Sequence, residues 1–168
     1  MNRLATLLFL PLLLVVDAVG AAPDWRGGPF QEGIEFAASA AALEEAAGRT
    51  RFDFLALGDL WVRVKVQNPP RLAALTLTFS SPSGTPFYEA TLLYTSDPAL
   101  RNGRVNGVPA TVLQGKHVPG GWVFDYPVPV SGTVFQRYPK PGSWVVQARI
   151  ESTETSLSAP LEVSYGSP

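Results

Sequence analysis

The sequence contains no cysteine, one histidine and one methionine in 168 residues. Without cysteine no disulfide can hold the fold together, so stability must come from buried apolar surface. Zinc and copper sites need clustered His, Cys or Met side chains, and none is expected here. The lone His117 is accompanied by no Gly-x-Ser-x-Gly pattern and no glycine-rich phosphate loop. We therefore expect a non-catalytic protein with no metal and no cofactor.

Charge of either sign is also scarce. Thirteen Lys and Arg residues against 14 Asp and Glu residues give a net charge of −1. Binding to a phosphate backbone needs a concentrated basic surface, so nucleic acid is not expected as a partner. The high alanine, proline, leucine and arginine content is typical of a GC-rich bacterial genome.

The N-terminus has the layout of a secretory signal peptide. Arg3 precedes an apolar run over residues 4–16, and small residues follow as far as Ala21. The run is shorter than the roughly 20 residues that span a bilayer, so we expect cleavage and no transmembrane segment afterwards. The alternative is an uncleaved membrane anchor, although Pro11 and Asp17 interrupt the run. The mature protein is then periplasmic, extracellular or at the cell surface.

Three segments follow from this division. Residues 1–21 are the predicted signal peptide, 22–50 a loop with one short helix, and 51–168 a β domain. The helix is predicted over Phe36–Ala47, which is rich in alanine and is followed by Gly48 at the usual C-terminal position.

From Arg51 onward the pattern is that of β-strands. Apolar side chains recur at every second position over 122–128 and 144–150, and a β-rich segment at 133–137 is predicted as a strand between them. Shorter segments with strand patterns are 52–56, 60–67, 75–79, 87–94, 108–114 and 161–165. Proline and glycine turns separate these segments. We predict an all-β fold, an antiparallel β-sandwich of immunoglobulin-like or jelly-roll type with eight or nine strands.

Two stretches carry a family resemblance. LTLTFSSPSGT at Leu75–Thr85 and PGSWVVQARI at Pro141–Ile150 resemble bacterial extracytoplasmic immunoglobulin-like modules and the P-domain sandwiches of secreted proteases. The resemblance covers roughly half of the mature chain. Those modules are usually attached to an enzyme, so the resemblance implies a non-catalytic binding or spacer role.

The candidate binding residues are aromatic or basic and lie on an outward strand face or in loops. They are Trp61, Arg63, Tyr94, Arg101, Arg104 and Tyr138. Exposed rings can anchor a protein partner or stack on a sugar, and cations in the 98–116 loop can meet an anionic surface. The alternatives are that Trp61 is covered by the helix or the N-terminal segment, and that the loop cations are only solvated.

Three functions remain open. The preferred one is an accessory or structural subunit that binds another cell-envelope or surface protein through loops or an unpaired edge strand. The alternative is a carbohydrate-binding module with an exposed aromatic platform for polysaccharide. The least supported is a hydrolase that pairs carboxylates from Asp53, Asp59, Glu89, Asp97 and Asp125. Turn positions explain Asp59 and Asp97, and Asp125 is expected to face solvent.

Overall fold

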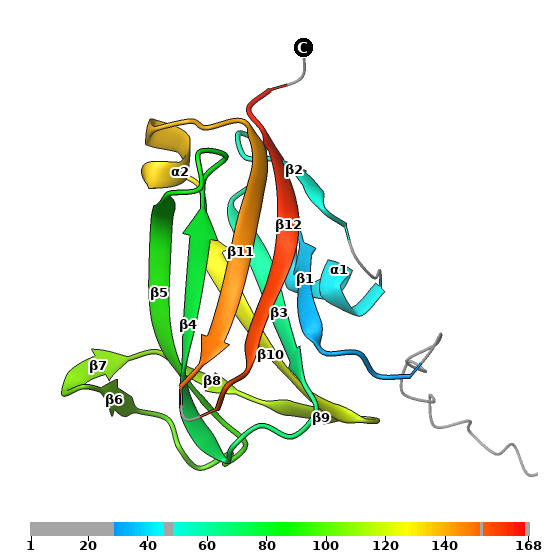
Figure 1. Cartoon of the computed structure of the whole chain (residues 1–168), viewed down its shortest axis with the longest axis vertical. Coiled ribbons are helices and arrows are strands. Elements are labelled where there is room, and N and C mark those ends of the chain that lie inside the picture. The colour runs from blue at the N-terminus through cyan, green and yellow to red at the C-terminus, as the bar shows by residue number, and fades with distance from the viewer. Residues whose placement is uncertain (1–28, 46–48, 152, 167–168) are drawn as a thin grey trace, which may run out of the picture.

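The computed structural model describes residues 29–45, 49–151 and 153–166. The predicted signal peptide and its cleavage site lie outside these residues. The described chain is built mainly from β-strands with two short helices, which confirms the all-β prediction (Figure 1). Neither helix in this part of the chain is long and apolar enough to cross a bilayer.

One sheet has four strands and is antiparallel throughout. Its order is β1 (Gly33–Ala37), β3 (Asp59–Val66), β10 (Gly121–Pro129) and β9 (Lys116–Val118). The alternation that predicted β3 and β10 is present. Every second side chain of β3 is buried on the same face, and in β10 Phe124 and Val128 lie in the core with Trp122 and Tyr126 packed against it.

The other large sheet has six strands. Their order is β2 (Arg51–Asp53), β12 (Ser156–Ser164), β11 (Gly142–Ile150), β4 (Leu72–Ser80), β5 (Pro86–Thr95) and β8 (Val112–Gln114). The ladders from β12 to β5 are antiparallel, as expected. Antiparallel pairing was the wrong prediction for the two outer ladders, because β2 runs parallel to β12 and β8 runs parallel to β5.

A small hairpin projects beside β5. It consists of β6 (Gly103–Val105) and β7 (Val108–Ala110), which pair with each other (Figure 1). Asn106 and Gly107 form its tip with φ angles of 51° and 82°. Asn-Gly is the pair that tolerates two positive φ angles in a tight hairpin turn. Residues 98–107, which were expected to be part of a loop, therefore contain the short strand β6.

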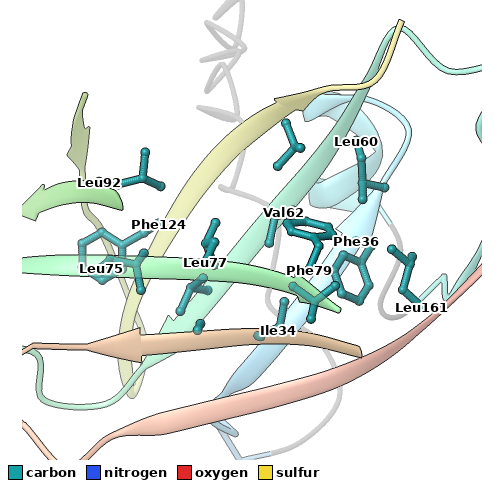
Figure 2. Packing of buried hydrophobic residues seen from close by; sticks show 14 of the residues in the cluster. Ile34, Phe36, Leu60, Val62, Leu75, Leu77, Phe79, Leu92, Phe124 and Leu161 are labelled. Carbon is teal, nitrogen blue, oxygen red and sulfur yellow. The ribbon is translucent and has the colours of Figure 1, made fainter. Parts of the chain in front are cut away.

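The inward side chains of both large sheets form one core. Leu60 and Val62 of β3 meet Leu77 and Phe79 of β4 in this cluster. Figure 2 shows these residues together with neighbours from β1, β5, β10 and β12. Full burial of such a side chain contributes about 1.5–3 kcal/mol. Because the chain has no cysteine, this shared core stabilises the fold in place of disulfides.

The predicted helix over Phe36–Ala47 was wrong at its N-terminal end. Phe36 belongs to β1, where it pairs with Val62 and is buried in the core. Among the described residues, helix α1 covers Ala40–Glu45 and begins after Ser39, whose Oγ accepts a hydrogen bond from the main-chain N–H of Ala42 at 3.2 Å. The predicted end of the helix at Ala46 and Ala47 lies outside the described residues. Burial of an aromatic side chain outweighed the local helix propensity.

The predicted strand at 133–137 was also wrong, because these residues form helix α2 (Val134–Arg137). Thr133 caps the helix by accepting a hydrogen bond from the N–H of Phe135 at 3.4 Å. The single turn places Phe135 against the rings of Phe54 and Phe79, at centroid distances of 5.5 and 5.7 Å. A threonine cap and one buried ring thus decided the structure of this segment.

Candidate functional site

The outer edge of β5 is open over most of its length. β5 pairs with β4 from Pro86 to Thr95, but on the other side β8 pairs only with Leu93–Thr95. No strand of the described chain pairs with the outer edge of β5 before Leu93. Figure 1 shows this part of β5 at the margin of the sheet. The open edge is the candidate binding site.

The direction of the main-chain N–H groups shows which residues of β5 face the open edge. The N–H of Leu93 points away from β4, because it donates to the carbonyl oxygen of Thr111 at 2.9 Å. Alternate residues of a strand direct their N–H and C=O groups to the same side. Thr91 and Glu89 therefore present their main-chain groups to the open edge, as a template for another strand.

The side chains along this edge fall into two faces. Tyr88 and Ala90 are half-buried and pack against the core, whereas Glu89 and Thr91 are exposed on the outer face. The carboxylate of Glu89 accepts a hydrogen bond from Oγ1 of Thr78 at 3.4 Å. An added strand would thus meet an apolar inner row and a polar outer row.

The start of β5 is anchored by aromatic contacts. A register shift between Phe79 and Ser80 allows both Phe87 and Tyr88 to contact the ring of Phe135, at centroid distances of 5.7 and 5.2 Å. Pro86 has no N–H, and proline at such a position is typical of an edge strand. The open stretch is therefore short, and ring contacts hold its first residues against the core.

The β6–β7 hairpin forms one wall of a pocket beside the edge. The pocket has a volume of about 280 Å³ and is lined by Thr91, Val105, Asn106, Val108, Pro109 and Ala110. The hairpin lies close to β5 because Gly103 faces Leu93, and a Cβ at Gly103 would clash with Cδ2 of Leu93. Val108 keeps 66% of its surface exposed. The pocket thus combines an apolar wall with the outer face of β5.

Arg63, a predicted binding residue, is fully buried. Its guanidinium donates from Nε and Nη2 to the two carboxylate oxygens of Asp125 at 2.7 and 2.8 Å, and from Nη1 to the carbonyl of Leu43 at 3.0 Å. Helix α1 covers this part of the four-stranded sheet, so the prediction of a solvated outer face for β3 was wrong there. Asp125, which was expected to face solvent, is only partly exposed and pairs with Arg63.

Glu44 of α1 extends this charge cluster. Its Oε1 accepts hydrogen bonds from Nη2 of Arg63 at 2.9 Å and from Nζ of Lys116 at 3.1 Å. Burial acts to raise the pKa of Glu44, but the two cationic donors outweigh it and lower the pKa below its ordinary value. For Arg63, burial acts to lower the pKa, but the carboxylates of Asp125 and Glu44 outweigh this effect and raise the pKa above its ordinary value. The cluster stays charged and fastens α1 to the sheet.

Tyr94 is another predicted binding residue that is fully buried. Its ring lies 4.5 Å from the ring of Phe124, and its hydroxyl group has no hydrogen-bond partner among the described residues. Burial raises the pKa of Tyr94 to about 12. It offers no exposed ring to a partner.

The remaining predicted residues are accessible but dispersed. Trp61 is half-buried on β3, and Tyr138 is 65% exposed just after α2. Arg101 and Arg104 are exposed, with Nη1 of Arg104 donating to the carbonyl of Gly107 at 2.7 Å. Figure 1 shows α2 and the β6–β7 hairpin at opposite ends of the molecule. These residues form no single site and no row of exposed rings.

Three polar residues that were considered for chemistry have local structural contacts. Asp53 accepts hydrogen bonds from the N–H groups of Leu55 and Gly166, both at 3.0 Å. A hydrogen bond from the N–H of Ala99, together with the pairing with Arg71, lowers the pKa of Asp97. The ring of His117 lies edge-on to the indole ring of Trp122, with 5.2 Å between the ring centroids. Within the described ranges, no three His, Cys, Asp or Glu side chains are grouped as metal ligands would be.

The comparisons with known proteins are negative: the chain matches no protein-family model and no curated protein sequence. The sequence pattern did not identify Glu89 and Thr91 as residues of the open β5 edge, although it suggested an unpaired edge strand. A charged residue and a proline within one strand, Glu89 and Pro86, are signals typical of sheet edges.

Proposed function

We propose that the protein is an exported, non-catalytic β-sandwich that binds another cell-envelope or surface protein through the open edge of β5. The four-stranded and six-stranded sheets are the two layers of the proposed sandwich. Export is proposed from the N-terminal sequence pattern. The edge is the observation that carries the binding role, because Glu89 and Thr91 direct unpaired main-chain groups outward.

An extended segment of a partner can complete such an edge. Main-chain hydrogen bonds then provide affinity, and side-chain positions along the strand provide specificity. Each hydrogen bond contributes about 0.5–1.5 kcal/mol net, so a short added strand also needs side-chain contacts. Tyr88, Ala90 and the pocket beside Thr91 offer those contacts. The arrangement suits an accessory or structural subunit.

The test is a proline substitution that removes one outward N–H. Thr91→Pro deletes a donor on the open side without deleting a donor to β4, whereas Thr91→Ala changes only the side chain. Both variants are first compared with the wild type by circular dichroism and thermal unfolding. Each is then used as bait with envelope extracts, and retained proteins are identified by mass spectrometry.

The expected result is a specific protein that wild type and Thr91→Ala retain and that folded Thr91→Pro loses. Val145→Ser is a control for a substitution at an exposed position away from the edge, because Val145 lies on β11, two strands from β5. Equal retention of that protein by wild type and Thr91→Pro would show that the edge is not the binding site.

A further inference from the structure

We infer that the β5 edge binds an antiparallel strand of a partner protein in which an apolar residue is followed, two positions later, by a basic residue. This inference rests on the proposed function and names the chemistry of the partner. Residues of a strand that are two apart lie on the same face. The apolar side chain lies opposite Thr91 and the basic one opposite Glu89.

The basic position follows from the surroundings of Glu89. Its carboxylate is exposed, it accepts a hydrogen bond from the neutral hydroxyl of Thr78, and it forms no ion pair with any described residue. A residue directly opposite on an added strand would have its Cβ about 4.5–5.5 Å away. Opposite charges at that position stabilise the pair, and like charges destabilise it. Lys or Arg therefore fits the position opposite Glu89.

The apolar position follows from the pocket beside Thr91. Its wall includes Val105, Val108, Pro109 and Ala110. Its volume of about 280 Å³ is below the roughly 300–1,000 Å³ of small-molecule sites. It suits one side chain of an added strand, and burial of a valine or leucine there removes apolar surface from water.

Length and direction are also constrained. The open stretch ends at Leu93, where β8 begins to pair, and at Pro86, which has no N–H. Phe87 lies at the register shift, so the partner pairs over about five residues, opposite Tyr88–Leu92. Antiparallel pairing is slightly more stable per residue than parallel pairing. An antiparallel strand passes Thr91 before Glu89, which places the apolar residue before the basic one.

A second copy of this chain satisfies the geometry less well. Only residues whose main-chain groups face outward can stand opposite Glu89 in a pair of two β5 edges. Within the open stretch these are Glu89 and Thr91, and neither is basic. The basic position favours another protein as the occupant.

The test uses three blocked peptides labelled with a fluorophore. The first is Thr-Val-Leu-Ala-Lys-Val-Thr, the second replaces its lysine with glutamate, and the third exchanges the leucine and the lysine. Fluorescence anisotropy at low salt measures their binding to wild type, Glu89→Lys, Thr91→Pro and Val108→Ser. Val145→Ser again serves as the control for an exposed valine away from the edge.

The lysine peptide is expected to bind wild type about threefold to tenfold more tightly than the glutamate peptide, and Glu89→Lys is expected to reverse this preference. Val108→Ser should weaken the lysine peptide several-fold, Val145→Ser should not, and Thr91→Pro should abolish binding. The peptide with exchanged residues should bind wild type more weakly.

Two results would overturn the inference while leaving the edge function intact. One is equal binding of all three peptides, without reversal by Glu89→Lys. The other is the absence of peptide binding while Thr91→Pro still loses the envelope protein. Concentration-dependent dimers in sedimentation velocity that disappear with Thr91→Pro would show that a second copy is the occupant, which would also overturn it. Unchanged capture of the envelope protein by Thr91→Pro would instead overturn the edge function itself.

Discussion

Arg63 on β3 and Asp125 on β10 stand opposite each other in the four-stranded sheet and share two hydrogen bonds of 2.7 and 2.8 Å. The guanidinium has no exposed surface, and its Nη1 donates to the carbonyl of Leu43 in α1. A buried charge is tolerated only when it is paired and hydrogen-bonded. The pair therefore connects sheet and helix, and its stability can be measured.

Asp125→Ala is expected to reduce the free energy of unfolding by about 3 kcal/mol. The substitution leaves the guanidinium of Arg63 buried without its two-point partner, and breaking a buried pair costs about 3–5 kcal/mol. The partly exposed Asp125 side chain favours the lower figure. Urea unfolding measures the change. Arg71→Met, which breaks the exposed pair with Asp97, should cost less than about 1 kcal/mol. Equal costs for the two variants would contradict this account.

Glu44 is expected to make the protein less stable in acid. Its pKa in the folded state lies below the ordinary value of 4.5, because the hydrogen bonds from Arg63 and Lys116 outweigh the opposing effect of burial. The unfolded chain therefore binds the proton first as the pH falls, and the stabilising contribution is present above pH 4.5 and lost below it. Urea midpoints between pH 6 and 3 should fall less for Glu44→Gln than for the wild type. Parallel pH profiles would show that Glu44 does not contribute.

Local patterns predicted the central strands well. Period two over 60–67 and 144–150 indicated β3 and β11, because these strands have one face in the core and one face outside it. β12 was expected only from Leu161, yet it begins at Ser156. Its polar residues Ser156 and Ser158 face outward and pair with Arg149 and Gln147. Polarity alone therefore does not separate a strand from a loop.

The candidate site was less predictable, since it depends on strand order. Glu89 and Thr91 lie in a strand that the sequence indicated, but no local pattern shows that β8 covers β5 only from Leu93 onward. The burial of Arg63 likewise depends on α1 and on Asp125, which is 62 residues away in the chain. Such long-range pairings are not encoded in residue spacing.

Tyr94→Phe is expected to raise the free energy of unfolding by about 1 kcal/mol. The Tyr94 hydroxyl is buried without a partner in the described chain, and an unsatisfied buried group costs about 1–3 kcal/mol. The aromatic contact with Phe124 is retained. Thermal and urea unfolding at pH 7 measure the change, with Tyr138→Phe as the control for an exposed ring. A loss of stability in Tyr94→Phe would show that the hydroxyl makes a favourable contact.

The same residue predicts a difference in alkali. Burial raises the pKa of Tyr94 from 10.0 to about 12, so the unfolded chain releases its proton first as the pH rises. Ionisation of Tyr94 therefore favours the unfolded chain: it leaves the free energy of unfolding unchanged below pH 10 and lowers it towards pH 12. The wild type should thus lose more stability than Tyr94→Phe between these values, as measured by urea midpoints. Tyr88, whose pKa burial also raises, remains in both proteins and cancels in the comparison.

Phe135→Ala is expected to be the most damaging of these substitutions. Phe135 is buried on α2, and its ring also packs against Trp144 at 5.9 Å. Removal of a buried phenylalanine costs about 3–5 kcal/mol through lost burial and the cavity that remains. Val134→Ala, the adjacent position on the same helix turn, is partly exposed and should cost less than about 1 kcal/mol. The urea midpoint of Phe135→Ala is expected to lie well below that of Val134→Ala, because the Phe135 ring joins α2 to both β4 and β11. Equal midpoints for the two variants would show that the ring does not stabilise the fold.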